Sequence, residues 1–217
     1  MATGRTYSDR CGIARALDVV GERWALLVVR ELLLGPKRFT DLRAGLPHVS
    51  PDVLSQRLRE LEAAGVVARR TLPPPAGARV YELTDWGQEL QPAIIQLARW
   101  GARAPVPAGD AGLGVDSAVI ALLTLFDPGA AGDLSASYEL RLSDQRFRAR
   151  VSGGRLDVSR GSADRPDATI DTDPETLAAV LWHGRELAEA LRSGRLEIEG
   201  SRAAAGRFLK LFPLPND

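Results

Sequence analysis

The apolar residues of the stretch SPDVLSQRLRELEAAG, residues 50–65, recur every three or four positions. This period predicts one amphipathic helix whose buried stripe is formed by Leu54, Leu58 and Leu61. Ser50 is a favourable N-cap, Pro51 stands where a missing N–H costs nothing, and Gly65 is a typical C-terminal stop. The polar side chains of the same helix must therefore point away from the core.

The neighbouring segments predict six more helical or strand regions on the same scale. Helical periods cover residues 11–20 and 22–34, and a short helix follows in RFTDLRAGL, residues 38–46. Two β-rich runs, residues 66–72 and 79–83, are separated by the turn PPPAGA, and a last helix runs from Thr84 to about Trp100. A short helix, a turn, a capped second helix and a hairpin are the order of a winged helix-turn-helix.

A winged helix-turn-helix places its second helix in the major groove of double-stranded DNA, which is about 12 Å wide. The candidate base-reading residues are those on or near the polar side of this helix, namely Ser50, Asp52, Ser55, Gln56 and Arg59. Gln can pair with adenine and Arg with guanine. Arg57, one step round the helix, reaches either a phosphate or a neighbouring carboxylate. The candidate phosphate contacts are Lys37, Arg38, Arg69, Arg70 and Arg79. Each residue taken singly is equally well explained as solvated surface.

The second half of the chain follows a different pattern. Residues 102–114 are rich in Gly, Pro and Ala and predict a linker, and the helix that follows, residues 117–126, is apolar on all sides. Alternating residues then predict strands around residues 138–142, 147–151 and 156–158, with further strands at 168–170 and 196–198. Helices are predicted over residues 173–182, 186–192 and 201–212. The predicted fold class is α+β: an N-terminal winged domain, residues 1–101, and a C-terminal antiparallel sheet covered by helices, residues 115–217.

Charge is uneven along a chain whose formal net charge is zero. Residues 1–103 carry 15 Arg and Lys against 11 Asp and Glu, whereas residues 104–217 carry 13 against 17. A basic half beside an acidic half is consistent with a polyanion-binding domain joined to another module. Hydrophobic residues make up 45% of the chain, which is enough for two packed cores.

The sequence contains no recognisable catalytic set. It lacks a G-x-S-x-G elbow, a phosphate-binding glycine loop and paired cysteines at zinc spacing, so neither an enzyme, a metal site nor a cofactor is predicted. No apolar run approaches the roughly 20 residues of a membrane span, and no signal peptide is apparent. A single cysteine fits a reducing compartment, and the expected location is the cytoplasm without membrane attachment.

Residues 7–101 resemble the HxlR-type winged-helix regulators of bacteria. The resemblance rests on the cysteine that opens the first helix, G-E-R-W at 21–24, F-T-D-L-R at 39–43, the segment S-P-D-V-L-S-Q-R-L-R-E-L-E, and Y-E-L-T at 81–84. It implies a DNA-binding transcriptional regulator that forms a homodimer through its first and last helices. A two-fold dimer spaces its recognition helices about 34 Å apart and predicts a pseudo-palindromic operator. One departure is Gly12, where the family often has proline.

Cys11 allows two interpretations. In HxlR-type proteins the corresponding cysteine sometimes senses oxidants or electrophiles, and Arg10 and Arg15 would favour its thiolate. The alternative is a small buried apolar residue, which is the commoner role of a free cysteine.

The C-terminal half resembles the sterol-carrier-protein-2-like fold over about residues 115–213, through R-L-E-I-E-G at 195–200 and a capped helix ending in F-L-K-L-F. The resemblance implies a small apolar ligand held between sheet and helices. The candidate lining residues are Leu122, Phe126, Phe147, Trp182 and Phe208, with His183 as a polar anchor. Each apolar residue of this set is also explained as an ordinary core residue. His183, which precedes Gly184, is also explained as a surface residue. The alternative function is a lipid or small-molecule carrier whose winged domain only dimerises.

Overall fold

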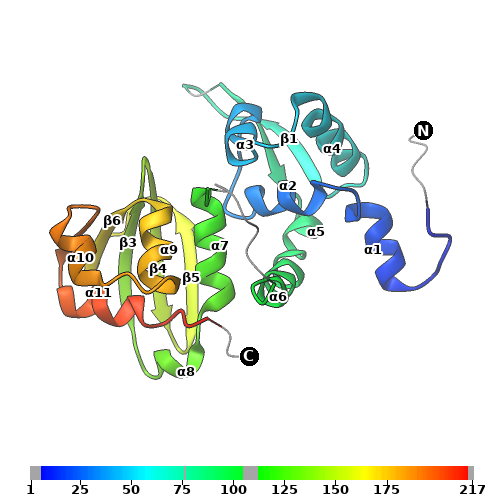
Figure 1. The fold of residues 1–217 in the computed structure, drawn as a ribbon. Coiled ribbons are helices and arrows are strands. Elements are labelled where there is room, and N and C mark those ends of the chain that lie inside the picture. Colours follow the sequence, from blue (N-terminus) through cyan, green and yellow to red (C-terminus); the bar gives the residue numbers. More distant parts are fainter. Residues whose placement is uncertain (1–5, 76, 105–111, 215–217) are drawn as a thin grey trace. The chain divides into compact units, whose positions relative to one another are not determined.

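The computed structural model of the protein describes residues 6–75, 77–104 and 112–214. The chain divides into two compact units, Met1–Ile94 and Ile95–Asp217, each with its own apolar core (Figure 1). The first contains a helix-turn-helix and a two-stranded wing, and the second contains a larger sheet with helices. The predicted α+β class with an N-terminal winged helix-turn-helix is confirmed. Of the predicted linker, residues 105–111 lie outside the described residues.

The first unit follows the predicted order of elements. Its helices are α1 (Gly12–Val20), α2 (Ala25–Leu32), α3 (Phe39–Gly45), α4 (Pro51–Ala63) and α5 (Asp85–Gln88). The wing strands β1 (Val67–Thr71) and β2 (Arg79–Leu83) pair antiparallel, with Val67 opposite Leu83 and Thr71 opposite Arg79. The helix α2 is shorter than predicted because Trp24, directly before it, has a left-handed backbone with φ of 77°, which interrupts the helix expected from residue 22.

The boundaries of α4 have the causes that the sequence suggested. The Ser50 hydroxyl accepts a hydrogen bond from the Val53 N–H at 3.3 Å, and Pro51 occupies the first helical position. Gly65 follows the helix with φ of 77°, a conformation that side chains disfavour. Leu54, Leu58 and Leu61 are buried in the core of the unit. The opposite side of α4 is consequently held outward.

The last predicted helix of the first half is divided in two. The Thr84 hydroxyl caps α5 by accepting from the Gly87 N–H at 3.0 Å, as predicted, but α5 ends at Gln88 and α6 (Gln91–Gly101) begins separately. The break has a physical reason in Pro92, which lacks the N–H that would donate to the Gln88 carbonyl in a continuous helix. The division between the two units falls within α6, after Ile94.

The second unit is built on a five-stranded sheet with the order β5-β4-β3-β6-β7. Its strands are β3 (Ala136–Leu142), β4 (Gln145–Ser152), β5 (Arg155–Arg160), β6 (Ala168–Thr172) and β7 (Leu196–Gly200). The meander β3–β4–β5 was predicted, but the sheet as a whole is mixed rather than antiparallel, because β6 runs parallel to β3. The chain passes from edge strand β5 across β4 and β3 through residues 161–167, and this crossover returns β6 in the direction of β3.

One face of this sheet is apolar and lies under helices (Figure 1). These are α7 (Val115–Leu125), α9 (Pro174–Trp182), α10 (Leu187–Arg192) and α11 (Arg202–Leu209), with the short α8 (Pro128–Ala131) at one end. The inward side chains Tyr138, Leu140, Leu142 and Phe147 are completely buried. No helix in the part of the chain that the structure describes is both long and apolar enough to span a bilayer.

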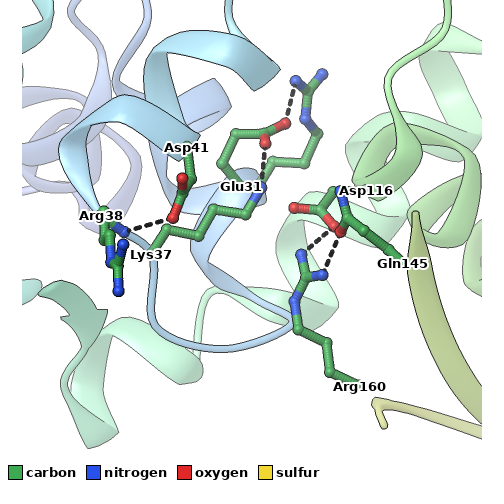
Figure 2. A network of polar contacts seen from close by, with 8 residues as sticks. Glu31, Lys37, Arg38, Asp41, Asp116, Gln145 and Arg160 are labelled. Atoms are coloured by element: carbon green, nitrogen blue, oxygen red, sulfur yellow. Dashed lines mark hydrogen bonds and ion pairs between the residues drawn. The ribbon is translucent and has the colours of Figure 1, made fainter. Parts of the chain in front are cut away.

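A polar cluster ties the start of α7 to the sheet. The Arg160 guanidinium donates to Asp116, in the first turn of α7, and to Gln145 at the start of β4 (Figure 2). The same guanidinium lies 5.0 Å from the centre of the Phe147 ring. Charge pairing and a cation–π contact therefore compensate the burial of Asp116.

The opposite face of the sheet carries Glu139, which is nevertheless buried. Its carboxylate accepts from Arg141 Nε and from the Ala163 N–H of the crossover, both at 2.9 Å. Burial raises the pKa of this carboxyl, but the bonds to Arg141 and Ala163 and the charges of Arg141 and Arg146 outweigh it and hold the pKa below 4.5.

We expect Glu139→Gln to lower the free energy of unfolding by about 1 kcal/mol at pH 7. A lowered folded pKa stabilises the fold above the ordinary value near 4.5, and this contribution is lost as the pH falls through the folded pKa. The difference between Glu139→Gln and the parent should therefore shrink as the pH falls below 4.5. Urea unfolding at several pH values measures it, with exposed Glu197→Gln as the control; a difference independent of pH would contradict the assignment.

Candidate nucleic-acid interface

The exposed side of α4 carries the residues predicted to read bases. Asp52, Gln56 and Arg59 are exposed and lie on the face opposite the leucine stripe, and Ser55 is half-buried at its edge. Ser50 is exposed too, but its hydroxyl oxygen already serves as the helix cap. The first three turns of α4 thus offer a carboxylate, an amide and a guanidinium to a partner.

Three neighbouring side chains on α4 are linked to one another. Gln56 Nε2 donates to Glu60 Oε1 at 2.9 Å, and Arg57 Nη1 pairs with the other oxygen of the same carboxylate. Arg57 also lies 3.7 Å from Glu22 Oε2, and its side chain is only 12% exposed. Arg57 was predicted to reach either a phosphate or a neighbouring carboxylate. In the structure it lies beside two carboxylates.

The wing carries three exposed arginines. Arg69 pairs with Glu62 at 2.9 Å and lies 5.4 Å from the centre of the Tyr81 ring, and Arg70 pairs with Glu82 at 2.9 Å. Arg79 is exposed at the start of β2. Exposed ion pairs of this kind contribute little to stability, so their guanidinium groups can exchange a carboxylate for a phosphate at small cost.

Lys37 is placed differently from what the sequence suggested. The prediction of a phosphate contact is corrected, because Lys37 is only 9% exposed and its ammonium lies 2.6 Å from Glu31 Oε2 (Figure 2). Glu31, 2% exposed, also pairs with Arg30 at 2.8 Å. The backbone of Lys37 bridges to Tyr81 of the wing. Lys37 is therefore a structural residue that joins the start of the α3 region to β2.

Arg38 remains exposed in front of α3, where its backbone N–H donates to Asp41 Oδ2 at 3.1 Å. In contrast to the buried Lys37 directly before it, Arg38 is exposed to solvent.

Two residues of the interface were not singled out from the sequence. Val53 is 39% exposed on α4 between Asp52 and Gln56, and an apolar side chain there can contact a thymine methyl group. Glu60 accepts from Gln56 and pairs with Arg57. The spacing of Glu60 at i+4 from Gln56 and i+3 from Arg57 was the available signal.

Cys11 is the exposed residue that precedes α1. Its backbone N–H donates to Asp9 Oδ1 at 2.9 Å. The exposed position makes the thiol accessible to reagents. It does not agree with the alternative interpretation of Cys11 as a buried apolar residue.

The residues predicted to line a ligand site occupy the second unit. Leu122, Phe147 and Phe208 are completely buried, and Phe126 is nearly so. The half-buried Trp182 donates from Nε1 to the carbonyl of Phe212 at 3.0 Å. His183 ends α9 and is exposed, which agrees with its reading as a surface residue.

The helix-turn-helix, the wing and the exposed polar face of α4 define the class of winged helix-turn-helix transcription regulators. Comparison with known proteins agrees: residues 19–107 match the HxlR-like helix-turn-helix family. The chain belongs to this family through its N-terminal half.

Individual relatives match the same region. The HTH-type transcriptional regulator YvaP of Bacillus subtilis is 42% identical over 86 residues, which are 40% of this chain and 80% of that protein. The HTH-type transcriptional regulator YodB of the same organism is 35% identical over 39% of this chain and 76% of its own length. The solved structure of reduced YodB aligns with 47% of this chain and 100% of that chain, at 33% identity and a TM-score of 0.40.

The second unit is similar to a different family. Residues 117–217 match the alkyl sulfatase C-terminal family, and the sterol-carrier-like identity of this unit stays a prediction.

We expect Lys37→Met to lower the free energy of unfolding by about 3 kcal/mol, because it leaves the buried Glu31 carboxylate without its ammonium partner. The double variant Glu31→Gln with Lys37→Met should recover part of this loss, and exposed Arg38→Ala should change stability by less than about 0.5 kcal/mol. Urea unfolding measures all three. Unchanged stability of Lys37→Met, together with a smaller salt dependence of DNA binding, would restore the phosphate-contact interpretation.

Proposed function

We propose that the protein is a dimeric, sequence-specific DNA-binding transcription regulator. The observation that carries the proposal is the outward face of α4, where Asp52, Gln56 and Arg59 stand exposed on a helix whose other side is locked into the core. A rigid helix that presents amide and guanidinium groups is suited to hydrogen bonding with base edges in a major groove.

Cations around α4 support the same function. Arg38 precedes α3, and Arg69, Arg70 and Arg79 lie on the wing, so that cationic groups belong to three elements of one small unit. Phosphate contacts of this kind set affinity and register, whereas contacts to base edges set sequence choice.

Exposed apolar residues support a homodimer. Ile13 and Leu17 on α1 are 72% and 41% exposed, and Leu97 and Trp100 on α6 are 50% and 72% exposed. Each pair lies at i, i+4 or i, i+3 and so occupies one side of its helix. Large exposed apolar side chains on two helices are suited to an interface with a second copy, as the family resemblance also implies.

Two variants separate base reading from phosphate binding. Selection from random duplexes should yield a pseudo-palindromic site occupied by two chains of the parent protein. Arg59→Ala should relax sequence choice at one position per half-site, by about 1–3 kcal/mol. Arg70→Ala should weaken binding to all sequences alike and reduce the slope of log affinity against log salt by about one.

Arg165→Ala, in the second unit, is the control for the loss of one positive charge, since Arg165 is 93% exposed. A parent protein that binds duplex DNA neither selectively nor with salt dependence would contradict the proposal. Equal effects of Arg59→Ala and Arg165→Ala would remove α4 from the interface.

We infer, as a second part of the function, that the C-terminal unit binds a small apolar ligand that tunes DNA binding, in a sterol-carrier-like manner. The supporting observation is the hydroxyl of Tyr138, which is completely buried and has no hydrogen-bond partner among the described residues. It lies in an aromatic cluster, since the Tyr138 ring is 4.5 Å from that of Phe208, which is 5.0 Å from that of Phe212. Burial raises the pKa of this hydroxyl, so it remains a donor at neutral pH.

Oleate, which joins an apolar chain to a hydrogen-bond acceptor, is the test ligand. It should raise the unfolding midpoint of the parent protein, and Tyr138→Phe should weaken its binding about fivefold through the loss of one hydrogen bond. Without ligand, Tyr138→Phe should be as stable as the parent or more so, because an unpaired hydroxyl is removed from the core. Calorimetry and thermal unfolding measure both effects. Equal oleate affinity of the two proteins, or none, would contradict the inference.

A further inference from the structure

Glu60 receives contacts from two side chains of its own helix. Its Oε1 accepts from Gln56 Nε2 at 2.9 Å, and its Oε2 pairs with Arg57 Nη1. Gln56 precedes it by four residues and Arg57 by three, so that all three side chains are neighbours along α4. Both oxygens of the carboxylate are therefore engaged.

Arg57 holds this carboxylate from the buried side. Its side chain is 12% exposed, and the same Nη1 lies 3.7 Å from Glu22, between α1 and α2. A guanidinium confined in this way has little freedom to move. Glu60 is consequently supported by a fixed cation, while Gln56 stands on the exposed side.

The chemistry of a carboxylate then determines how the Gln56 amide lies. An ionised carboxylate only accepts hydrogen bonds, so the amide must turn its NH₂ group towards Glu60. The carbonyl oxygen of Gln56 then faces away from Glu60 and, with the second N–H of the amide, is left to present to a partner. In the major groove, adenine N6 and cytosine N4 are donors, whereas guanine O6 and N7 and thymine O4 are acceptors.

We propose that Glu60 is a positioning residue that makes Gln56 read an exocyclic base amino group. The inference rests on the proposed DNA-binding function and adds a chemical rule to it. At the position that Gln56 contacts, adenine or cytosine is preferred because its amino group donates to the Gln56 oxygen, and guanine or thymine is disfavoured because each brings an acceptor against that oxygen. Adenine, which the sequence suggested, is one of the two preferred bases.

The experiment uses the full chain and the DNA site selected by the parent protein. Gln56→Ala first identifies the contacted position as the one where base preference disappears. At that position the amino group is removed, by purine in place of adenine or 2-pyrimidinone in place of cytosine. We expect about fivefold weaker binding by the parent and no change for Gln56→Ala, the effect of one hydrogen bond.

Glu60→Ala tests the positioning role directly. With the carboxylate gone, the amide can rotate and offer its NH₂ to guanine or thymine, so the preference for an amino-bearing base should fall to near twofold or less. Glu62→Ala is the matched control, because it also removes one negative charge from α4. Glu62 pairs with Arg69 of the wing and not with Gln56 or Arg57 in the pairs described. Both variants should bind all DNA somewhat more tightly through the lost negative charge. Only Glu60→Ala should change base preference, while urea unfolding confirms that both remain folded.

The possible failures are distinguishable. A parent protein that selects no sequence contradicts the proposed function, and this inference with it. A selected site at which Gln56→Ala changes nothing, or at which the Gln56 position prefers guanine or thymine, leaves the regulator intact and overturns the reading rule. Equal loss of preference in Glu60→Ala and Glu62→Ala would assign the effect to charge rather than to the position of the amide.

Discussion

The burial of the leucine stripe on α4 is the constraint on which the interface depends. With Leu54, Leu58 and Leu61 in the core, the helix cannot rotate about its axis without exposing apolar area and leaving cavities. The Ser50 cap and the left-handed Gly65 set its two ends. The direction of each polar side chain is thereby determined by packing on the opposite side of the helix.

Charge pairing is the second determinant, and it sorts the cations of the first unit into two kinds. Lys37 is buried and Arg57 half-buried, and they pair with the carboxylates of Glu31 and Glu60. Arg59 and Arg79 are exposed, and the pairs of Arg69 and Arg70 lie in solvent, where a carboxylate is readily exchanged. The same residue types thus support carboxylates inside the unit and, in the proposed function, bind a polyanion at its surface.

Periodicity and capping chemistry predicted the elements of both units well, because buried stripes and turn residues are local properties of the chain. Three features were not predicted, each for a physical reason. Trp24 has a left-handed backbone, a conformation that is usually found at glycine, and the helix breaks before Pro92. The strand β6 runs parallel to β3, which depends on a crossover connection. In the interface, exposure on α4 followed from the helical period. The burial of Lys37 did not, because its partner Glu31 belongs to a preceding helix.

The treatment of buried polar groups connects the two units to their inferred roles. Glu31 and Asp116 are charged, and each is compensated by cationic side chains, as burial of a charge requires. The Tyr138 hydroxyl is neutral, so leaving it unpaired costs much less, and a fold can retain it where a ligand supplies the acceptor. The buried carboxylates Glu31, in the first unit, and Asp116, in the second, are thus paired with cationic side chains. The Tyr138 hydroxyl within the aromatic cluster keeps its bonding capacity, which is the basis of the inferred ligand site.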